Sequence, residues 1–397
     1  MSSGPLWAPP AQVPRHIRSC YARDMTPLER VHVGFIGCGR ISTLQVLGYL
    51  DHAHAEVLAV CDRDAGLARQ RATEWGARKV YAEVADLLAD PDVNAVEIAL
   101  PHHLHRDVAV AALRAGKHVS LQKPPTLTLQ ELKDVHEAAL AAGRRFRVLE
   151  NFMYYPPHVK ARELVEDGAI GEPLSVRIKT AGGRPEDGWT ISHATQSWRM
   201  RPETCGGGPM LFDHGYHSYN MARFFVREPV ERVHTWAHVN RFGPNDFFDA
   251  PILVSWKYAG VPKFGSWEVI PSIGMRVRSK YYAADDRIEI HGLEGIIWVT
   301  RCTGFLLDEP ALVLYRNGET RAWHDIPSDW GESFRLGAHD FIDALIEGRQ
   351  AAQDYDEAAA TLRFAIAAHV AACEHREVRL DEVQLDTPAR LPLAAEA

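Results

Sequence analysis

Three side chains in this 397-residue sequence have the types that oxidation of an alcohol requires: Lys123, Asp213 and His217. Such a reaction needs a base that takes the hydroxyl proton while a hydride leaves the carbon. Histidine is the side chain whose ordinary pKa suits that task near neutral pH. Asp213 and His217 are four residues apart, so on a helix they lie on one face within a turn. A lysine can hydrogen-bond the alcohol oxygen and stabilise alkoxide character.

Each of these side chains also has a purely structural interpretation. Lys123 can be a solvated lysine at a strand end, and Asp213 and His217 can be a helix-start acid and a partly buried histidine. Two groups imitate a metal site, but no thiolate lies near them in sequence and we expect no metal: Asp213, His214 and His217, and His102, His103 and His105.

A glycine turn near the start of the chain indicates what could position these groups. The apolar, β-prone run 31–36 is followed by Gly37 and Gly39, and a helix is expected from Ser42. Strand, glycine turn and helix form the context of a dinucleotide fingerprint. Gly37 permits the tight turn, and Gly39 lets the backbone approach a pyrophosphate at the helix N-terminus. Ser42 stands where glycine or alanine is usual; a surface turn without a ligand is the alternative.

An acidic residue follows at the distance that a dinucleotide fold requires. The apolar run 56–61 predicts a second strand that ends at Asp62, 20 residues after Ser42. That position accepts hydrogen bonds from the adenosine ribose. Because an aspartate repels a 2′-phosphate, NAD is favoured, whereas the neighbouring Arg63 leaves NADP possible. A plain helix cap is the alternative reading of Asp62.

Strands and helices then alternate as far as residue 150. Thr128 and Glu131 form a capping box, and Gly143 ends the helix that it opens. Alternation of this kind predicts a parallel, doubly wound sheet. The expected helices are 83–89, 104–115 and the one after Thr128, and the expected strands are 95–100, 118–121 and 146–149.

Past residue 151 the pattern changes to successive strands separated by Gly or Pro, which is typical of an antiparallel sheet. The sequence thus predicts an α/β protein with a Rossmann doubly wound parallel sheet at 31–150. A C-terminal α+β domain at 151–397 carries a large, mostly antiparallel open sheet, and its last helices, within 334–375, are candidates to pack back on the first domain. The expected strands are 174–179, 230–239, 252–258, 264–269, 288–291 and 296–300, and the expected helices 159–167, 334–346 and 357–373.

Composition limits the class of protein. A formal net charge of −8 argues against a nucleic-acid-binding surface, and no apolar run is long enough to span a membrane. Residues 1–30 are proline-rich, lack a secretory apolar core, and are expected to be a disordered or peripherally packed arm; Met25 is an alternative translation start. Six widely separated cysteines without a C-x-x-C pair indicate a reducing cytoplasm.

Two longer motifs carry a family resemblance. The first is Gln122-Lys123-Pro124, and the second is a glycine run, 206–208, that leads into Asp213-His214-Gly215-Tyr216-His217. On these motifs the chain resembles the glucose–fructose oxidoreductase/inositol dehydrogenase (Gfo/Idh/MocA) family from residue 31 to about 375. That family combines a Rossmann domain, a Glu-Lys-Pro tripeptide and a glycine-rich turn before Asp-x-x-x-His.

The resemblance implies a role for each matching residue. Lys123 would bind the substrate hydroxyl and help to place the nicotinamide, His217 would shuttle the hydroxyl proton, and Asp213 would orient the substrate and tune the base. The expected cofactor-binding set is Gly37, Gly39, Arg40, Ile41, Asp62, Arg63, Pro101, His105, Gln122 and Lys123; the expected substrate-binding set is Lys123, Asn151, Tyr155, Trp198, Arg199, Asp213 and His217.

Two positions depart from the family pattern, and both bear on the identity of the substrate. Gln122 stands where the family tripeptide has glutamate. Tyr155 stands where sugar dehydrogenases of the family often have an arginine after Asn151. An anionic substrate remains open, because three cations could face the pocket: Arg199, Arg201 and Lys179.

We expect an NAD-dependent oxidoreductase that oxidises a secondary hydroxyl of a sugar, glycoside or cyclic polyol, with the second sheet joining a homodimer or homotetramer. One alternative is an NAD-dependent glycosidase, which oxidises a glycoside transiently, eliminates the aglycone and returns the hydride; Tyr216, Tyr219 or His193 would supply its additional acid or base. Another is a non-enzymatic, dinucleotide-sensing regulator.

Overall fold

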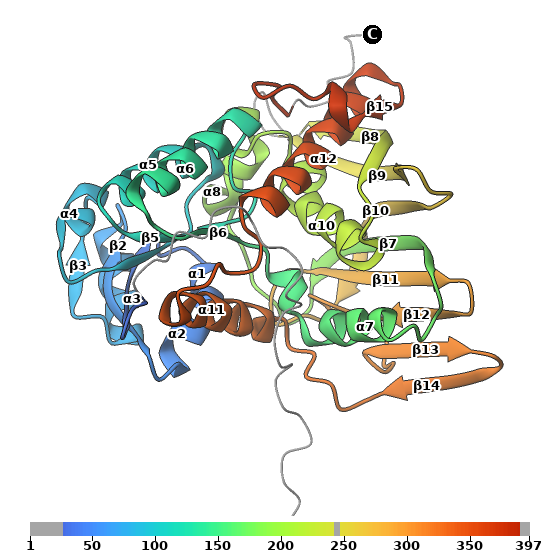
Figure 1. Ribbon diagram of the computed structural model, residues 1–397, viewed down its shortest axis with the longest axis horizontal. Coiled ribbons are helices and arrows are strands. Elements are labelled where there is room, and N and C mark those ends of the chain that lie inside the picture. The colour runs from blue at the N-terminus through green and yellow to red at the C-terminus, as the bar shows by residue number, and fades with distance from the viewer. Residues whose placement is uncertain (1–26, 242–246, 390–397) are drawn as a thin grey trace, which may run out of the picture.

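Two sheets lie side by side in the structure, with helices between them and around the first (Figure 1). The structure is a computed structural model and describes residues 27–241 and 247–389. Residues 1–26 of the expected N-terminal arm lie outside these ranges.

The first sheet is a six-stranded parallel sheet with the order β3-β2-β1-β4-β5-β6. This is the strand order of the Rossmann fold, and it confirms the predicted doubly wound sheet. Ligands bind such sheets at the carboxyl ends of the strands, where the strand order reverses. The strands are β1 Val31–Ile36, β2 Ala55–Cys61, β3 Lys79–Tyr81, β4 Ala95–Ile98, β5 His118–Gln122 and β6 Phe146–Leu149.

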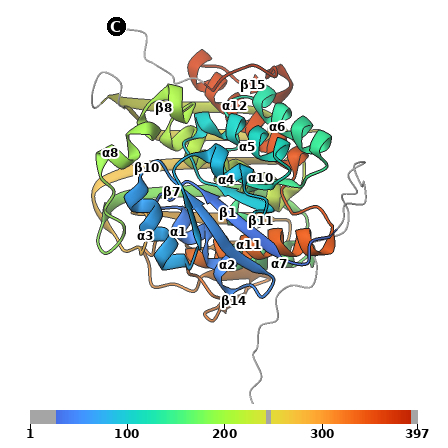
Figure 2. The same ribbon diagram turned by 90° about the vertical axis from the view of Figure 1, so that its left-hand side faces the viewer.

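Helices cover both faces of this sheet (Figure 2). One face packs on α4 (Val84–Ala89), α5 (His105–Arg114) and α6 (Leu129–Ala142), which share one apolar cluster. The other face packs on α2 (Leu47–Asp51) and α3 (Ala65–Trp75). The helix expected from Ser42 is interrupted after the short α1 (Ser42–Gln45), and α3 and β3 had not been predicted.

The capping of α6 follows the sequence in part. The Thr128 hydroxyl accepts a hydrogen bond from the Glu131 N–H at 3.2 Å, as the box predicts, but the Glu131 carboxylate turns to the Leu127 N–H at 2.8 Å. Gly143 ends the helix at φ +60°, a left-handed conformation that glycine adopts without strain.

The second sheet has nine strands in the order β14-β13-β12-β11-β7-β10-β9-β8-β15. It is antiparallel except for the parallel pair β7–β10, which confirms the mostly antiparallel sheet. The hairpin β13–β14 had not been predicted. The strands are β7 Pro173–Pro185, β8 Val230–Arg241, β9 Phe247–Tyr258, β10 Phe264–Val277, β11 Ala284–Gly292, β12 Gly295–Val299, β13 Leu312–Arg316, β14 Glu319–Trp323 and β15 Val378–Arg379.

One face of the nine-stranded sheet, called the inner face below, is covered by helices that separate it from the Rossmann sheet (Figure 1). These are α7 (Pro156–Glu166), α10 (Gly215–Val226) and α12 (Tyr355–Glu374). The helix α11 (Trp330–Glu347) instead buries Phe341 and Leu345 against the Rossmann core around Phe35 and Tyr49. The helix α11 therefore ties the second half of the chain to the Rossmann domain.

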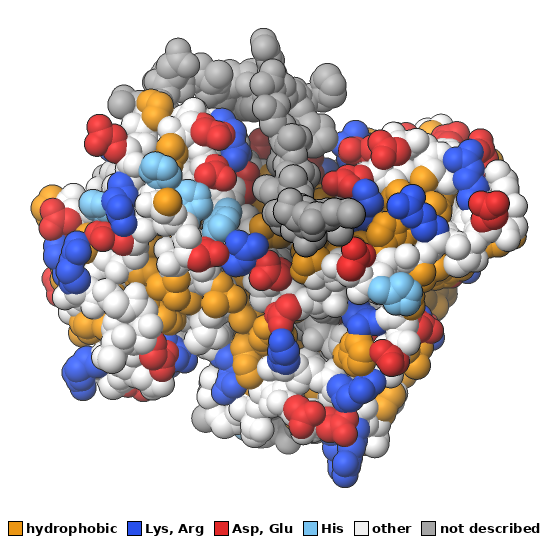
Figure 3. Space-filling model, turned by 90° about the horizontal axis from the view of Figure 1, so that it is seen from below, with side chains coloured by type: hydrophobic (Ala, Val, Ile, Leu, Met, Phe, Trp, Pro, Cys, Tyr) orange, Lys and Arg blue, Asp and Glu red, His pale blue; other side chains and the backbone are white. Residues whose placement is uncertain are grey.

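Figure 3 shows how charged side chains are distributed over one face of the molecule. On the face seen in Figure 3, Lys and Arg side chains are interspersed with Asp and Glu, without a broad patch of one sign. Within residues 27–241 and 247–389, no helix is both long and apolar enough to cross a bilayer.

Candidate active site

Lys123 stands directly after β5, at the carboxyl edge of the Rossmann sheet, where α/β folds bind ligands. Its ammonium nitrogen donates to the Asp213 carboxylate oxygen Oδ1 and to the Asp213 carbonyl oxygen, both at 2.8 Å. The structure thus brings together two predicted site residues that are 90 positions apart. An ammonium group has three N–H donors, so one remains for another partner.

Asp213 is an ionised carboxylate held between cations. Its Oδ2 accepts a hydrogen bond from Arg199 Nε at 2.8 Å, and His102 Nε2 lies 3.6 Å from its Oδ1. Burial by itself raises the pKa of Asp213, but Lys123 and Arg199 outweigh burial and hold this pKa well below its usual range. The carboxylate therefore stays charged and fixes the direction in which Lys123 points.

A π-helical turn, η4 (Pro209–His214), carries Asp213 and explains the glycine run before it. The buried Asp249 of β9 accepts hydrogen bonds from the N–H groups of Met210 and Leu211 at 2.9 and 2.7 Å. Gly208 has φ +132°, and a Cβ there would lie 2.4 Å from Asp249 Oδ2. Glycine is needed because the turn passes so close to the carboxylate that caps it. The sequence analysis had missed Asp249.

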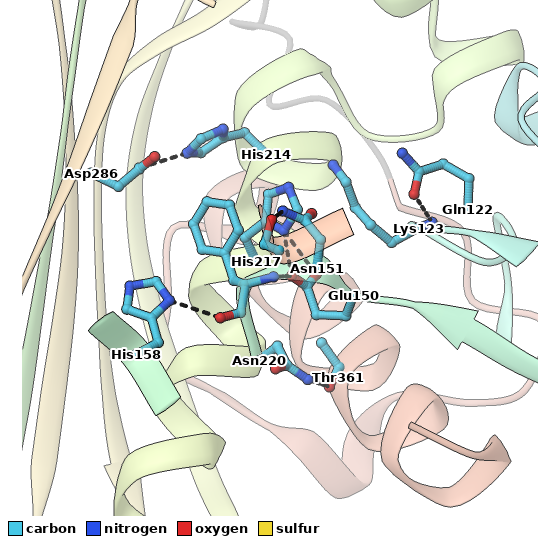
Figure 4. Close-up of polar contacts among 12 residues, drawn as sticks. Gln122, Lys123, Glu150, Asn151, His158, His214, His217, Asn220, Asp286 and Thr361 are labelled. Carbon is cyan, nitrogen blue, oxygen red and sulfur yellow. Dashed lines mark hydrogen bonds and ion pairs between the residues drawn. The ribbon is translucent and has the colours of Figure 1, made fainter. Parts of the chain in front are cut away.

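His217 on α10 is paired with Glu150, not with Asp213. Its Nδ1 lies 2.6 and 2.8 Å from the two carboxylate oxygens of Glu150, which is fully buried directly after β6 (Figure 4). The ring stacks on Phe152 with centroids 4.0 Å apart, and the Phe152 N–H donates to the same carboxylate at 2.9 Å. Glu150, and not Asp213, is therefore the carboxylate in contact with His217.

The environment of His217 keeps it neutral. Burial lowers the pKa of His217 to about 4, against the opposing effect of Glu150 and with a further lowering by Lys123. With Nδ1–H donated to Glu150, the other ring nitrogen, Nε2, carries the lone pair. No hydrogen bond to Nε2 is found within the described residues. Nε2 is therefore the atom that can accept a proton.

A second histidine–carboxylate pair lies beside the first. His214 Nε2 is 2.9 Å from Asp286 Oδ1 on β11, and the His214 and His217 rings have centroids 5.7 Å apart (Figure 4). The sequence had drawn attention to His214 only as part of a group that imitates a metal site, and it had not singled out Asp286. Neither carboxylate partner, Glu150 or Asp286, carries a local motif, although the place of Glu150 at the end of a parallel strand was a usable signal.

The glycine turn has the geometry of a dinucleotide site. Gly37 has φ +96°, and a Cβ there would lie 2.4 Å from the Ala99 carbonyl oxygen, so only glycine fits. A Cβ on Gly39 would meet no described atom within 4 Å, which leaves room for a ligand to approach the backbone. Asp62 accepts hydrogen bonds from the N–H groups of Cys38 and Asp64 at 2.8 and 2.9 Å. These residues fit the adenosine half of the cofactor.

Arg40 links the glycine turn to the second half of the chain. Its guanidinium lies 5.3 Å from the centre of the Trp189 ring and donates to the Thr190 carbonyl oxygen at 3.2 Å. The neighbouring Ser42 folds back to donate to the Gly39 carbonyl oxygen at 2.6 Å. The segment after β7 therefore reaches over the turn where the cofactor is expected.

The remaining residues of the expected cofactor set differ in burial and in hydrogen-bond partners. Ile41 and Pro101 are half-buried, and Arg63 is exposed. His105 is buried, with its two nitrogens 3.0 and 2.8 Å from the carbonyl oxygens of Pro124 and Leu100, so it braces the loops after β4 and β5 from behind. Gln122 accepts a hydrogen bond from the Lys123 N–H at 2.9 Å.

Several residues named from the sequence are buried and have hydrogen-bond partners within the protein, or lie elsewhere on the second sheet. Asn151 is buried and donates to Ser333 on α11 at 2.7 Å, and Tyr155 is buried with its hydroxyl on the Ser328 carbonyl oxygen at 3.2 Å. Tyr216 and Tyr219 are fully buried, with hydroxyls on backbone carbonyl oxygens. Lys179 pairs with Glu268 on the outer face of the nine-stranded sheet, so its expected pocket position is wrong.

The Trp-Arg pair does lie at the site. The Arg199 guanidinium lies 4.5 Å from the centre of the Trp198 ring, and Trp198 meets His102 edge to face at 4.8 Å. His193 and Arg201 are exposed. Within residues 27–241 and 247–389, no group of three or more His, Cys, Asp or Glu is arranged to hold a metal ion.

Fold and site together define an oxidoreductase with a dinucleotide-binding domain, and comparison with known sequences gives the family. Residues 31–150 match the family described as an oxidoreductase family with an NAD-binding Rossmann fold, and residues 158–298 match the GFO/IDH/MocA C-terminal domain. The chain belongs to this family, as the resemblance implied, and it carries an NAD-binding Rossmann domain.

The relatives include several enzymes of carbohydrate chemistry. The chain is 29% identical to 1,5-anhydro-D-fructose reductase of Ensifer adhaerens, over 66% of this chain and 73% of the relative. It is 26% identical to myo-inositol 2-dehydrogenase of Thermotoga maritima, over 89% and 99%. A levoglucosan dehydrogenase solved with NADH shares the fold with a TM-score of 0.74 at 24% identity, over 88% and 99%.

Proposed function

We propose that this chain is an NAD-dependent dehydrogenase that oxidises a secondary hydroxyl of a sugar or cyclic polyol. The observation that carries the proposal is a donor and an acceptor in one site: Lys123 has one N–H to spare, and His217 has an Nε2 that no described group bonds. The two lie close enough for the Lys123 charge to lower the pKa of His217. Lys123 stands at the carboxyl edge of the same sheet that carries the glycine turn.

The two groups divide the work on the alcohol. Lys123 donates its remaining N–H to the alcohol oxygen and stabilises the negative charge that develops there. His217 Nε2 accepts the hydroxyl proton, and Glu150 stabilises the imidazolium that forms, as a buried carboxylate does for a histidine base. A nicotinamide bound on the Rossmann domain supplies the acceptor for the hydride.

The charges of the site favour a neutral, polyhydroxylated substrate. The charge of Arg199 is balanced by Asp213, to which Arg199 gives its Nε–H. The groups that can meet a ligand here include a lysine N–H, the remaining N–H donors of Arg199, two imidazoles and the edge of Trp198, which suit hydroxyl groups. The relatives act on a cyclitol and on anhydrosugars by their names, in agreement with this substrate class.

We further propose a preference for NAD over NADP. Asp62 is fixed by two backbone N–H groups, so its carboxylate cannot turn away from the ribose. A fixed carboxylate binds a ribose diol and repels a 2′-phosphate.

The alternatives have less support. Glycoside cleavage without net oxidation begins with the same hydride step, but Tyr216 and Tyr219, which were expected to supply its additional acid or base, are buried on backbone carbonyl oxygens. A dinucleotide sensor has no need of a neutral histidine held by a buried carboxylate. Accumulation of NADH separates the three candidates. A dehydrogenase forms NADH in proportion to substrate, a redox-neutral glycosidase converts its substrate without accumulating NADH, and a sensor converts neither the substrate nor NAD.

The direct test is NADH formation by the purified protein with NAD and a panel of sugars, anhydrosugars and cyclitols. We expect oxidation of at least one of them, and loss of kcat by about 10²-fold or more in His217→Ala. An unchanged rate in that variant, or no turnover across the panel despite NAD binding, would contradict the proposal.

We also propose that the outer face of the nine-stranded sheet joins two copies of the chain. Trp236 and Leu253 are directly opposite on β8 and β9 and are 58% and 41% exposed, and Phe264 and Ile270 on β10 are 56% and 36% exposed. Exposed apolar side chains gathered on one sheet face are typical of an interface. Light scattering should show a dimer or tetramer that Trp236→Glu dissociates and Trp323→Glu, on β14, does not.

A further inference from the structure

His214 and its partner Asp286 form a second built unit of the site that the dehydrogenase chemistry does not use. Asp286 is 1% exposed, and its Oδ1 contacts His214 Nε2 at 2.9 Å and the Thr180 hydroxyl at 2.6 Å. The Thr303 hydroxyl lies 3.2 Å from its other oxygen. The His214 side chain is 19% exposed, which makes it the accessible end of this unit.

The hydrogen-bond directions in this unit follow from its chemistry. The Trp267 indole N–H lies 2.9 Å from the Thr180 hydroxyl, and an indole can only donate. Thr180 accepts that bond and therefore gives its single proton to Asp286. His214 keeps the pKa of Asp286 low, at about 2 although burial opposes this, so the carboxylate accepts from His214 Nε2–H.

The tautomer of His214 is thereby fixed, and its other nitrogen is left for a ligand. When the ring holds a single proton, on Nε2, its lone pair is on Nδ1. No hydrogen bond to Nδ1 is found within the part of the chain that the structure describes. His217 is fixed in the opposite tautomer by Glu150 and leaves Nε2 free. The site thus presents two imidazole acceptors, each locked by its own buried carboxylate.

We propose that His214 binds a second substrate hydroxyl, on the carbon next to the one that is oxidised, so that the enzyme selects vicinal diols. The inference rests on the proposed dehydrogenase function and names its substrate class. Ring centroids 5.7 Å apart allow two neighbouring hydroxyls to donate one bond to each ring, since each such bond spans about 2.8 Å. The hydroxyl on His217 loses its proton and its carbon loses a hydride to NAD, whereas the hydroxyl on His214 keeps its proton.

The rigid surroundings favour recognition over proton transfer at His214. Gly215, which joins the two histidines, has no room for a side chain, because a Cβ there would lie 2.9 Å from Trp267 and 3.0 Å from Tyr219. The His214 ring also lies over Trp267, with centroids 6.1 Å apart and planes at 23°. A ring held by Asp286 and Trp267 discriminates by position, and a site built to bond a hydroxyl rejects analogues in which that hydroxyl is displaced.

The test compares two isomeric probes, cis-cyclohexane-1,2-diol and cis-cyclohexane-1,3-diol, in the full-length protein. Both are assayed as substrates with NAD and as ligands of the NADH-bound protein by calorimetry. We expect the wild type to prefer the 1,2-diol by about tenfold or more in kcat/KM and in Kd. His214→Gln keeps a donor towards Asp286 but replaces the fixed lone pair at Nδ1 with an amide oxygen on a flexible side chain, so the preference should fall to about threefold or less.

A matched control is His339→Gln, which alters a His–Asp pair, with Asp51, on α11 away from the site. That variant should keep the preference for the 1,2-diol. The inference is overturned when the wild type binds neither isomer or prefers neither, when His214→Gln keeps the preference, or when His214→Gln abolishes kcat for both diols. Diol-selective binding that depends on His214 but yields no NADH would overturn the dehydrogenase proposal alone.

Discussion

The Lys123 ammonium nitrogen lies 2.8 Å from the Asp213 carboxylate oxygen, and this pair joins the Rossmann sheet to the π-helical turn of the second half of the chain. The ion pair is buried on both sides. An unpaired charge in a buried position costs free energy. The pair therefore fixes the position of Lys123 and couples the two halves of the chain at the site.

Replacement of Lys123 by methionine should lower kcat by about 10²-fold to 10³-fold, because the donor to the developing alkoxide is lost. Steady-state NADH formation measures this, and circular dichroism together with NAD binding shows that the variant is folded. Lys133→Met, at an exposed lysine paired with Glu137, is the matched control and should leave kcat unchanged. A rate within about threefold of wild type in Lys123→Met would contradict the role of Lys123.

Glu150 should act through His217. Glu150→Gln retains an oxygen that can accept from His217 Nδ1 but removes the charge that stabilises the imidazolium, so we expect kcat to fall by about 10²-fold. Because Glu150 raises the pKa of His217, its loss should also move the acid limb of kcat/KM from near pH 4 to lower pH. The pH profile separates this from a structural defect, and Glu163→Gln, at an exposed pair with Lys160, should change neither quantity. An acid limb that stays in place would argue against the pairing.

Substitution of the two glycines of the turn should impair different properties, stability for Gly37 and NAD binding for Gly39. Gly37→Ala forces a side chain against the Ala99 carbonyl oxygen at φ +96°, so the melting temperature should fall. Gly39→Ala meets no described atom, so the melting temperature should hold while Kd for NAD rises by about tenfold or more. Calorimetry of both variants with and without NAD distinguishes the two effects. Normal NAD affinity in Gly39→Ala would mean that no cofactor approaches the backbone there.

The protein should lose stability in mild acid. A lowered histidine pKa means that the unfolded chain binds protons first as the pH falls below 6.5, so the free energy of unfolding decreases from there towards pH 4. Burial is the main cause in each case. Six described histidines have pKa values of about 3 or 4: His102, His105, His118, His158, His217 and His369.

Three buried carboxyls act in the opposite direction, because burial raises their pKa values to about 6 or 7: Glu97, Asp249 and Asp285. They take up protons in the folded state as the pH falls and offset part of the loss, but the histidines outnumber them. We expect the melting temperature at pH 5 to lie about 5 °C or more below that at pH 7. Scanning calorimetry across this range is the measurement, and an equal or higher value at pH 5 would contradict the prediction.

The sequence by itself determined the features that depend on neighbours along the chain. Strand, glycine turn and helix were predictable at Gly37 because a short apolar run, a positive φ and a helix start are local properties. The alternation of strands and helices predicted the parallel sheet, and the motifs that carry the family resemblance gave Lys123, Asp213 and His217 as candidate site residues. The strand Lys79–Tyr81 was not predicted because it is three residues long and only half-buried, so it carries no apolar pattern.

Only the tertiary structure decided which carboxylate pairs with Lys123 and with each histidine of the site. Asp213 and His217, four residues apart, were expected to act on each other, but the π-helical turn ends between them and directs Asp213 to Lys123, 90 residues away. His217 turns to Glu150, 67 residues away, and His214 to Asp286, 72 residues away. Hydrogen bonds and burial act over a few ångströms of space whatever the separation along the chain, so the partners that set the charge and tautomer of each histidine emerge only when the two sheets are packed together.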